Sequence, residues 1–228
     1  MGHKIRPTAI RIGIIENWHS RGMSKKGMIS RLEQDELIRG VIKKRIGQAG
    51  IDKIDIERTN NVCRVVIHAA RPGLIIGRGG KGIEELHAFL VKQLEKLERK
   101  KLTRNTTIKK EKLNLAISVE ELKKNDVSAM VIAQSIASDL ERRTSTRQAM
   151  RKYLDTIMQY REVRGAKLLL SGRLDGAEIA RNARLMKGVL PLQTLRARID
   201  YGEATAFTIY GTVGIKVWIY KGEVFIEK

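Results

Sequence analysis

A run of glycines between residues 76 and 83 is the segment of this sequence whose residue types most directly suggest chemistry. It reads Ile76-Gly77-Arg78-Gly79-Gly80-Lys81-Gly82-Ile83. Glycine lets the backbone approach an anion closely because no Cβ intervenes, and the two cations add positive charge. A nucleotide-binding P-loop needs Ser or Thr after its lysine and a glycine at position 75. Gly82 and Ile75 occupy these two positions, so the spacing excludes a P-loop.

A dinucleotide site is the second interpretation of the same segment. Gly77, Gly79 and Gly82 satisfy the pattern G-x-G-x-x-G. In that fingerprint the first glycine directly follows a strand. Here the seven residues from Ala70 to Ile76 separate Gly77 from the nearest predicted strand, and no βαβ pattern follows. The context therefore disfavours an NAD-type site.

The spacing I-G-x-x-G-x-x-I, matched by Ile76, Gly77, Gly80 and Ile83, is similar to the signature loop of KH RNA-binding domains. That loop joins two helices and clamps the backbone of about four nucleotides. Amide groups at the start of the following helix point at the phosphates, and we expect Ile76 and Ile83 to anchor the loop in the core. A glycine turn that serves packing alone is the alternative. The predicted RNA-binding residues are Gly77, Arg78, Gly79, Gly80 and Lys81.

The elements around this loop follow the order of a type II KH domain, α-β-β-α-α-β. Apolar residues recur at helical or alternating spacing along each of them. Gly50 is predicted to end the first helix, and Asn60-Asn61 to form a tight turn between strands. A basic extension, residues 1–33 with a flexible arm at 18–30, precedes the predicted KH domain at 34–122. The predicted elements are a helix at 34–49, strands at 54–57 and 62–69, a helical turn at 72–76, a helix at 83–97 and a strand at 113–119.

The second half, residues 123–228, predicts another α+β domain with helices packed on an antiparallel sheet. A helix at 127–143 ends at a break, and Ser145 with Gln148 forms a capping box that starts the next helix, to about residue 161. Residues 167–171 read as a strand and 177–186 as a helix. Residues 195–227 alternate and predict two or three strands. The fold class of the whole chain is therefore α+β.

The charge of the chain indicates a polyanionic partner. Lys and Arg number 45 against 25 Asp and Glu, a formal net charge of +20. This charge is spread along the chain rather than gathered on one amphipathic helix, which favours nucleic acid over a membrane surface. Cys63 is the only cysteine and the four histidines are scattered, so we expect no disulfide framework, no metal site, no cofactor and no enzymatic activity. Without a signal peptide or an apolar span, we expect a soluble intracellular protein.

Four stretches together resemble one family, the bacterial-type small-subunit ribosomal protein S-three family. They are GHKIRPTAIRIGI, IHAARPGLIIGRGG, SGRLDGAEIARNARLMKGVLPLQTLRARIDYG and YGTVGIKVWIYKGE, and their order and spacing match across nearly the whole chain. The resemblance implies a cytoplasmic protein, of a bacterium or an organelle, in the head of the small ribosomal subunit. It implies binding to ribosomal RNA and to the neighbours S-ten and S-fourteen. It also implies a place beside S-four and S-five in the channel where messenger RNA enters. No membrane and no small-molecule substrate are expected.

The resemblance also implies a role for the helix after the break. In the family, basic residues there face incoming messenger RNA and help to unwind it. The matching positions are Arg147, Gln148 and Arg151, with Arg143 just before the break. The family shows a basic residue at the first three positions, so Gln148 departs from its pattern. Arg147 and Arg151 are spaced i, i+4 and share one helix face; a merely solvated charged face is the alternative.

Eight further cations are candidates for ribosomal RNA contact. Arg181 and Arg184 would lie on one face of the predicted helix at 177–186, and Arg196 and Arg198 would project the same way from a strand. Some of these arginines could instead pair with Asp175, Glu178 or Asp200. The full set is Lys4, Arg6, Arg11, Arg173, Arg181, Arg184, Arg196 and Arg198.

Two other function classes compete with a ribosomal protein. A free-standing KH regulator would bind RNA with sequence preference off the ribosome, but would have no reason to carry the C-terminal stretches. An enzyme with a dinucleotide site ranks third, and a purified chain that binds no NAD would remove it.

Overall fold

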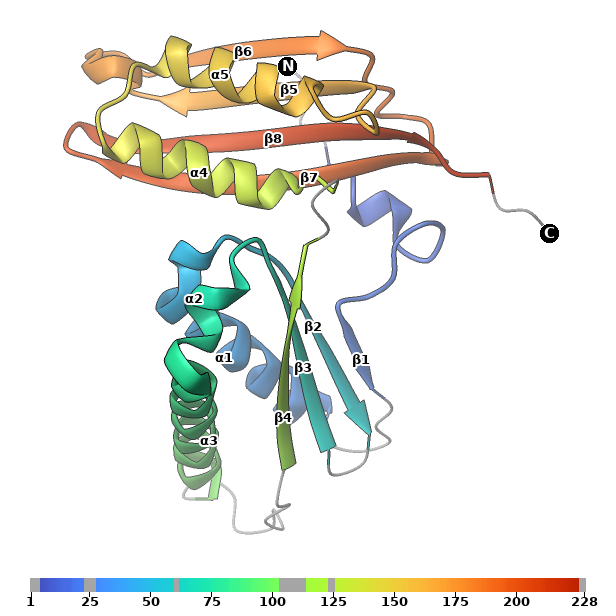
Figure 1. Ribbon diagram of the computed structural model, residues 1–228, viewed down its shortest axis with the longest axis vertical. Helices are drawn as coiled ribbons and strands as arrows, with labels where there is room; N and C mark the ends of the chain where they lie inside the picture. Colours follow the sequence, from blue (N-terminus) through green and yellow to red (C-terminus); the bar gives the residue numbers. More distant parts are fainter. Residues whose placement is uncertain (1–4, 23–27, 60–61, 103–113, 123–125, 226–228) are drawn as a thin grey trace. The chain divides into compact units, whose positions relative to one another are not determined.

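The chain folds into two compact units, which are described separately. A computed structural model describes residues 5–22, 28–59, 62–102, 114–122 and 126–225 (Figure 1). His19–Leu122 form the KH unit, and Met1–Trp18 join Lys123–Lys228 in the C-terminal unit. The extension expected at 1–33 is therefore divided between the units. The predicted Asn60-Asn61 turn and Lys4 lie outside the described residues.

The KH unit has the predicted order α-β-β-α-α-β, preceded by a short strand. Its sheet has the order β1-β2-β3-β4, with β2 and β3 antiparallel and with β1 and β4 parallel to their neighbours (Figure 1). Its elements are β1 (Ser20–Gly22), α1 (Met28–Ile46), β2 (Ile51–Thr59), β3 (Val62–Ala69), α2 (Pro72–Ile76), α3 (Lys81–Leu102) and β4 (Asn114–Glu121).

The core of the KH unit is aliphatic and lies between the sheet and the long helices. Ile54 and Ile56 of β2 are buried against Ile38 of α1 and Leu90 of α3, which are fully buried. Asp55 and its alternating neighbours face the other side of the sheet, as the period of two requires. Gly50 takes the left-handed conformation just beyond α1 and a short 3-10 turn, as predicted.

The segment predicted as a flexible arm, residues 18–30, contains structure where it is described. Ser20–Gly22 pair with β2, and α1 begins at Met28 rather than at residue 34. The Gly-, Ser- and Lys-rich composition of the segment predicted a flexible loop, so neither β1 nor the start of α1 was expected there. A residue of the next element holds β1 in place: Arg39 of α1 donates to the carbonyl oxygen of His19 (2.7 Å) and to Oγ of Ser20 (2.9 Å). Tertiary contacts therefore override the local composition.

The C-terminal unit is a four-stranded antiparallel sheet in the order β6-β5-β8-β7, with both helices on one face (Figure 1). Buried aliphatic residues of the helices, such as Ile136 and Ile157, pack against Leu168, Val217 and Ile219 of the sheet. Among the described helices of the chain, none is long and apolar enough to cross a membrane. The elements are α4 (Ala129–Glu141), α5 (Thr146–Met158), β5 (Gly165–Gly172), the 3-10 turn η4 (Leu174–Gly176), β6 (Arg181–Gly188), β7 (Ala197–Thr208) and β8 (Gly211–Glu223).

The helix predicted at 177–186 is wrong, because the chain forms β6 there. β6 pairs with β5 from Gly172↔Arg181 to Gly165↔Gly188. Ala183 and Leu185 pack against the core, whereas residues 184 and 186 are exposed. Ala, Arg, Leu, Met and Lys are good helix formers, which favoured the helix locally. Pairing with β5 and burial of alternate side chains outweigh that preference.

Candidate nucleic-acid interface

The glycine loop joins α2 to α3 through backbone that only glycine adopts without strain. Gly77, Gly79 and Gly80 have φ of 68°, 63° and 81°, in the left-handed region. A Cβ at Gly82 would come within 2.5 Å of the carbonyl oxygen of Ile75. The glycines therefore allow the first turn of α3 to approach the end of α2 closely.

Two cations project from this loop without ion-pair partners. Arg78 and Lys81 are exposed, and among the described residues neither contacts a carboxylate. The expectation that Ile76 anchors the loop is wrong, because Ile76 is 39% exposed. The neighbouring Ile75, 2% exposed, anchors it against α3, and Ile83 is half-buried. Ile75 and Ile76 are adjacent and of the same type, so residue type alone could not indicate which of them is buried.

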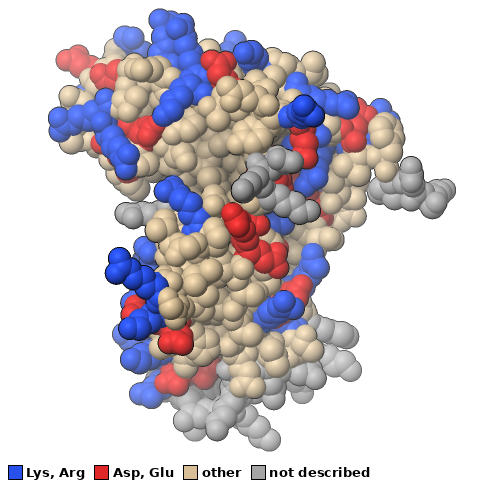
Figure 2. All heavy atoms as spheres, in the orientation of Figure 1, with Lys and Arg blue, Asp and Glu red and all other residues tan. Residues whose placement is uncertain are grey.

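Basic side chains continue along α3 beyond the loop. Lys92, Lys96 and Arg99 are exposed on this helix, and Figure 2 shows Lys and Arg side chains gathered along the α3 side of the KH unit. Glu95 offsets part of this charge by pairing with Arg99 at 3.8 Å. Residues 103–113, which follow α3 in the chain, lie outside the described residues.

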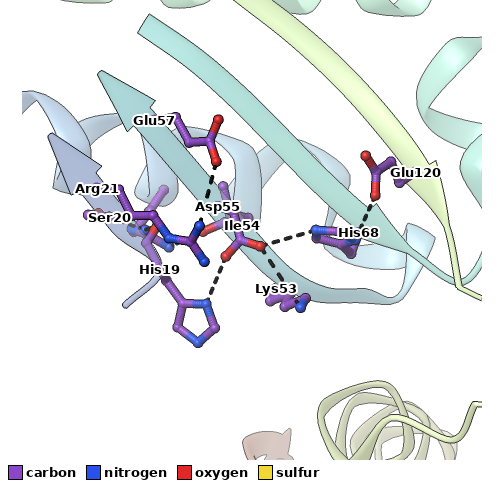
Figure 3. Close-up of polar contacts among 10 residues, drawn as sticks. His19, Ser20, Arg21, Lys53, Ile54, Asp55, Glu57, His68 and Glu120 are labelled. Atoms are coloured by element: carbon purple, nitrogen blue, oxygen red, sulfur yellow. Dashed lines mark hydrogen bonds and ion pairs between the residues drawn. The ribbon is translucent and has the colours of Figure 1, made fainter. Parts of the chain in front are cut away.

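A polar cluster on the sheet of the KH unit holds β1 against β2 (Figure 3). The two carboxylate oxygens of Asp55 lie 2.8 Å from Nδ1 of His19 and 3.2 Å from Nε2 of His68, whose Nδ1 is 3.5 Å from Glu120. Burial raises the pKa of Asp55, but the hydrogen bond from His19 and the charges of Lys53 and the two histidines outweigh it. The resulting pKa lies below its ordinary value.

Through its contacts this cluster links the residue before β1 to β2, β3 and β4. Among the described residues, no group of His, Cys, Asp and Glu is arranged to hold a metal ion. Sequence reasoning treated His19 and His68 as scattered. Strand alternation does place His68 on the Asp55 side of the sheet, but the position of His19 depends on β1, which was not predicted.

α5 exposes the cations predicted to meet messenger RNA and buries its apolar side. Arg147, Gln148 and Arg151 are exposed, whereas Met150 and Leu154 pack against the sheet. Neither arginine has an ion-pair partner among the described residues.

Two neighbouring cations provide a contrast. Lys152 is engaged, because its Nζ lies 3.5 Å from Asp139 and 5.3 Å from the ring centroid of Tyr153. Arg143, exposed in the turn before α5, has a φ of 64° and no carboxylate partner among the described residues. Arg143, Arg147 and Arg151 are therefore available to an external anion.

The start of α5 is capped by a residue far away in the sequence. Ser145 occupies the N-cap position but makes no side-chain capping bond, so the predicted capping box with Gln148 is wrong. Instead Oδ1 of Asp175 accepts from the amide of Thr146 (2.9 Å) and from its hydroxyl (2.7 Å). A carboxylate at a helix N-terminus also complements the helix dipole. This bond fixes η4, with Arg173 beside it, against the beginning of α5.

Of the eight cations predicted to contact ribosomal RNA, Arg11 requires correction. It is completely buried. Its guanidinium donates to the carbonyl oxygens of Ala197 (2.7 Å), Pro7 (2.7 Å), Leu192 (3.0 Å) and Thr194 (2.9 Å). Arg11 therefore fastens the N-terminal segment to the C-terminal unit and is unavailable to RNA. Its position in a basic, extended segment gave no signal of this role.

The other described members of that set lie on different faces. Arg181 shares the strand face of Ala183 and Leu185, towards α5, whereas Arg184 faces the opposite side, so the predicted pairing of Arg181 and Arg184 on one helix face is wrong. Arg196 and Arg198 are both exposed, on either side of buried Ala197.

Some of these cations have internal partners. Arg6 pairs with Glu203, and Arg196 pairs with Glu223 at 2.6 Å. Asp200, considered as a partner for an arginine, accepts from the amide of Ala129 at the start of α4 (2.8 Å) and lies 3.8 Å from Nζ of Lys221. Arg173, Arg181, Arg184 and Arg198 form no ion pair with any described carboxylate.

Comparison with known proteins gives matches to both units and to the whole chain. The family model for the KH domain matches residues 37–127, and that for "Ribosomal protein S3, C-terminal domain" matches residues 136–219. The chain is 45% identical to the small ribosomal subunit protein uS3 of Finegoldia magna over 98% of this chain and 84% of that protein. It is 42% identical to uS3 of Clostridium novyi, over 100% and 96%. These names designate ribosomal constituents, in agreement with the prediction that the chain is not an enzyme.

Proposed function

Because this chain belongs to the uS3 family of small ribosomal subunit proteins, we propose that it binds ribosomal RNA in the subunit head while α5 grips messenger RNA. The gripping residues are Arg143, Arg147 and Arg151, which lie in or just before α5, are exposed and lack ion-pair partners among the described residues. That availability is the observation on which the proposal rests. A row of fixed cations holds the phosphates of a single strand electrostatically and without reading sequence.

The KH loop is the proposed contact to ribosomal RNA. Gly77, Gly79 and Gly80 keep the loop backbone free of side chains, and Arg78 and Lys81 project unpaired beside it. Phosphates can therefore approach the amide groups at the start of α3. In the C-terminal unit, Arg173, Arg181, Arg184 and Arg198 are the remaining candidates.

The proposal includes the place of the protein in the subunit. Its neighbours would be S-ten and S-fourteen, with S-four and S-five around the channel where messenger RNA enters. The KH domain would span residues 34–122 and the second domain 123–228. Unwinding would use the motion of messenger RNA through the ribosome, since fixed cations can hold separated strands without hydrolysing a nucleotide.

Replacing Arg147 and Arg151 together with alanine tests the grip. Neither side chain contributes to the core, so folding and assembly should stay intact. Ribosomes carrying the double variant should pause longer at a stable messenger hairpin. The dependence of log K for single-stranded RNA on log salt should fall by about 1.4, at roughly 0.7 for each phosphate contact. Unchanged pausing and an unchanged salt dependence would refute the proposal.

Two single variants serve as matched controls on the same helix. Lys152→Ala removes a cation that is already engaged by Asp139, so it should change the salt dependence much less. Gln148→Arg adds a cation at an exposed position next to Arg147 and should shorten the pause. Equal effects of Lys152→Ala and the double variant would indicate that total charge matters rather than the proposed helix face.

A further inference from the structure

Three segments distant in sequence meet at one end of the C-terminal unit. The amide of Phe207 in β7 donates to Glu141 at the end of α4 (3.0 Å). Thr146 at the start of α5 bonds to Asp175 of η4, and Arg173 donates to the carbonyl oxygen of Tyr210 (3.2 Å). Figure 1 shows the α4–α5 turn, η4 and the β7–β8 turn together at this end. These hydrogen bonds hold the three segments together near the beginning of α5.

Tyr210 is an aromatic side chain presented at this end of the unit. The ring of Tyr210, in the β7–β8 turn, packs against Gly176 of η4. A Cβ built on Gly176 would come within 3.2 Å of two atoms of this ring. The ring therefore rests on backbone that carries no side chain. Tyr210 remains 49% exposed, and no described residue forms a hydrogen bond with its hydroxyl. The residue therefore stays partly open to an external group although its ring contacts η4.

The charges around Tyr210 favour an anionic partner. Arg143, Arg147 and Arg173 are exposed at this end of the unit, where Figure 2 shows Lys and Arg side chains gathered. Two nearby carboxylates are engaged internally, Glu141 by the amide of Phe207 and Asp175 by Thr146. Arg173 also donates to the carbonyl oxygens of Ala177 and Tyr210, whereas Arg143 and Arg147 have no carboxylate partner among the described residues. An exposed aromatic ring beside such cations is the arrangement by which proteins bind single-stranded nucleic acid without sequence preference.

We propose that Tyr210 stacks on an unpaired base of the RNA strand whose phosphates Arg147 and Arg151 hold. Thr146 is hydrogen-bonded to Asp175, and each is followed in the chain by a residue of the proposed site, Arg147 and Gly176. The ring of Tyr210 rests on Gly176, so it lies near Arg147. The inference rests on the proposed function of α5. It adds a property that cations lack, because cations hold the phosphates of a duplex and of a single strand alike. A stacking ring needs an exposed base face, so it favours the strand after its pairs have opened.

Tyr210→Ala and Tyr210→Phe in the full chain separate stacking from other roles. Binding to a fluorescent oligouridine and to a duplex of equal length would be measured by anisotropy over a range of salt concentrations. Tyr210→Ala should weaken single-strand binding about five- to 150-fold, the usual loss for one stacked base. It should leave duplex binding and the salt dependence unchanged. Tyr210→Phe keeps the ring and should bind like the parent chain.

Three outcomes would overturn the inference. They are equal loss in Tyr210→Phe and Tyr210→Ala, equal loss of duplex and single-strand binding, and no loss at all. Normal RNA binding with failed incorporation into subunits would assign Tyr210 to a protein contact instead, and would also overturn it. Thermal unfolding of each variant checks the fold. The Arg147 and Arg151 double variant distinguishes the two proposals. If it reduces the salt dependence of RNA binding while the Tyr210 variants bind RNA normally, the stacking proposal is refuted and the phosphate contacts of α5 are supported.

Discussion

Replacing Arg11 with methionine should destabilise the C-terminal unit without reducing its capacity to bind RNA. The side chain is completely buried and donates to four carbonyl oxygens, three of which belong to residues 192–197. Burial lowers the pKa of Arg11, and Glu16 partly offsets that shift. Methionine fills a similar volume but donates nothing, so these carbonyl groups would be left without their donor.

The size of the loss follows from those bonds. A hydrogen bond to a charged group contributes about 1.5–3 kcal/mol, and a buried acceptor left unsatisfied costs about 1–3 kcal/mol. The four bonds share one guanidinium and are not additive, and water can reach some of the carbonyl groups. We therefore expect Arg11→Met to lower the free energy of unfolding by about 3–5 kcal/mol, within the range for breaking a buried network. Arg11→Lys should lose about half as much.

Urea unfolding followed by tryptophan fluorescence measures this loss. Trp218 lies in β8 beside the cluster formed by Ala197, Ile199 and Tyr220, so it reports on the region that Arg11 fastens. Trp18 would first be replaced by phenylalanine to leave one signal. Arg6→Ala is the matched control, because Arg6 belongs to the same segment but is exposed and pairs only at the surface. It should cost less than about 1 kcal/mol. A midpoint in Arg11→Met equal to that of the control would refute the reasoning.

Three further variants test the KH unit. Arg58 donates to Asp35 at 2.6 and 2.8 Å, and both side chains are nearly buried; Arg58→Met should cost about 3–5 kcal/mol in thermal unfolding, and Arg58→Met with Asp35→Leu should recover most of it, because the loss comes from an unpaired buried charge. The pKa of Asp55 lies below its ordinary 3.8, so its contribution to stability is complete above that pH and is lost as the pH falls through the lowered value. Asp55→Asn should therefore flatten the acid side of the stability profile, whereas parallel profiles for the two proteins would contradict this role.

The KH unit could be predicted from sequence because its signals are local. Helical and alternating periodicities fixed the order α-β-β-α-α-β, and the glycine spacing identified the loop. Gly50 and Gly77 stand where the backbone takes positive φ, which is a constraint that residue type reveals directly. α5 was predictable for the same reason, because Met150 and Leu154 mark its buried side and leave Arg147 and Arg151 outward.

The remaining features depend on contacts between distant residues. β6 consists of good helix formers and becomes a strand only because β5 offers it a partner. Asp175 caps α5 from 29 positions away, and a local capping box in the sequence suggested Ser145 instead. No pattern within one segment carries this information. Errors of this kind therefore cluster where two elements meet, and the proposed binding surface of the C-terminal unit is such a place.

The positive charge of the chain likewise cannot show which arginines meet a partner, whereas the structure separates internally paired arginines from exposed ones. Net charge predicts an anionic partner but treats all arginines alike. Arg11 and Arg58 serve internal carbonyl and carboxylate groups, whereas Arg147 and Arg151 find no such partner among the described residues. The distinction is energetic, because a buried guanidinium must satisfy its donors within the protein while an exposed one is satisfied by water until a phosphate displaces it. Candidate RNA contacts are therefore the exposed cations without carboxylate partners, and the surface proposed around Tyr210 combines such cations with an exposed aromatic side chain.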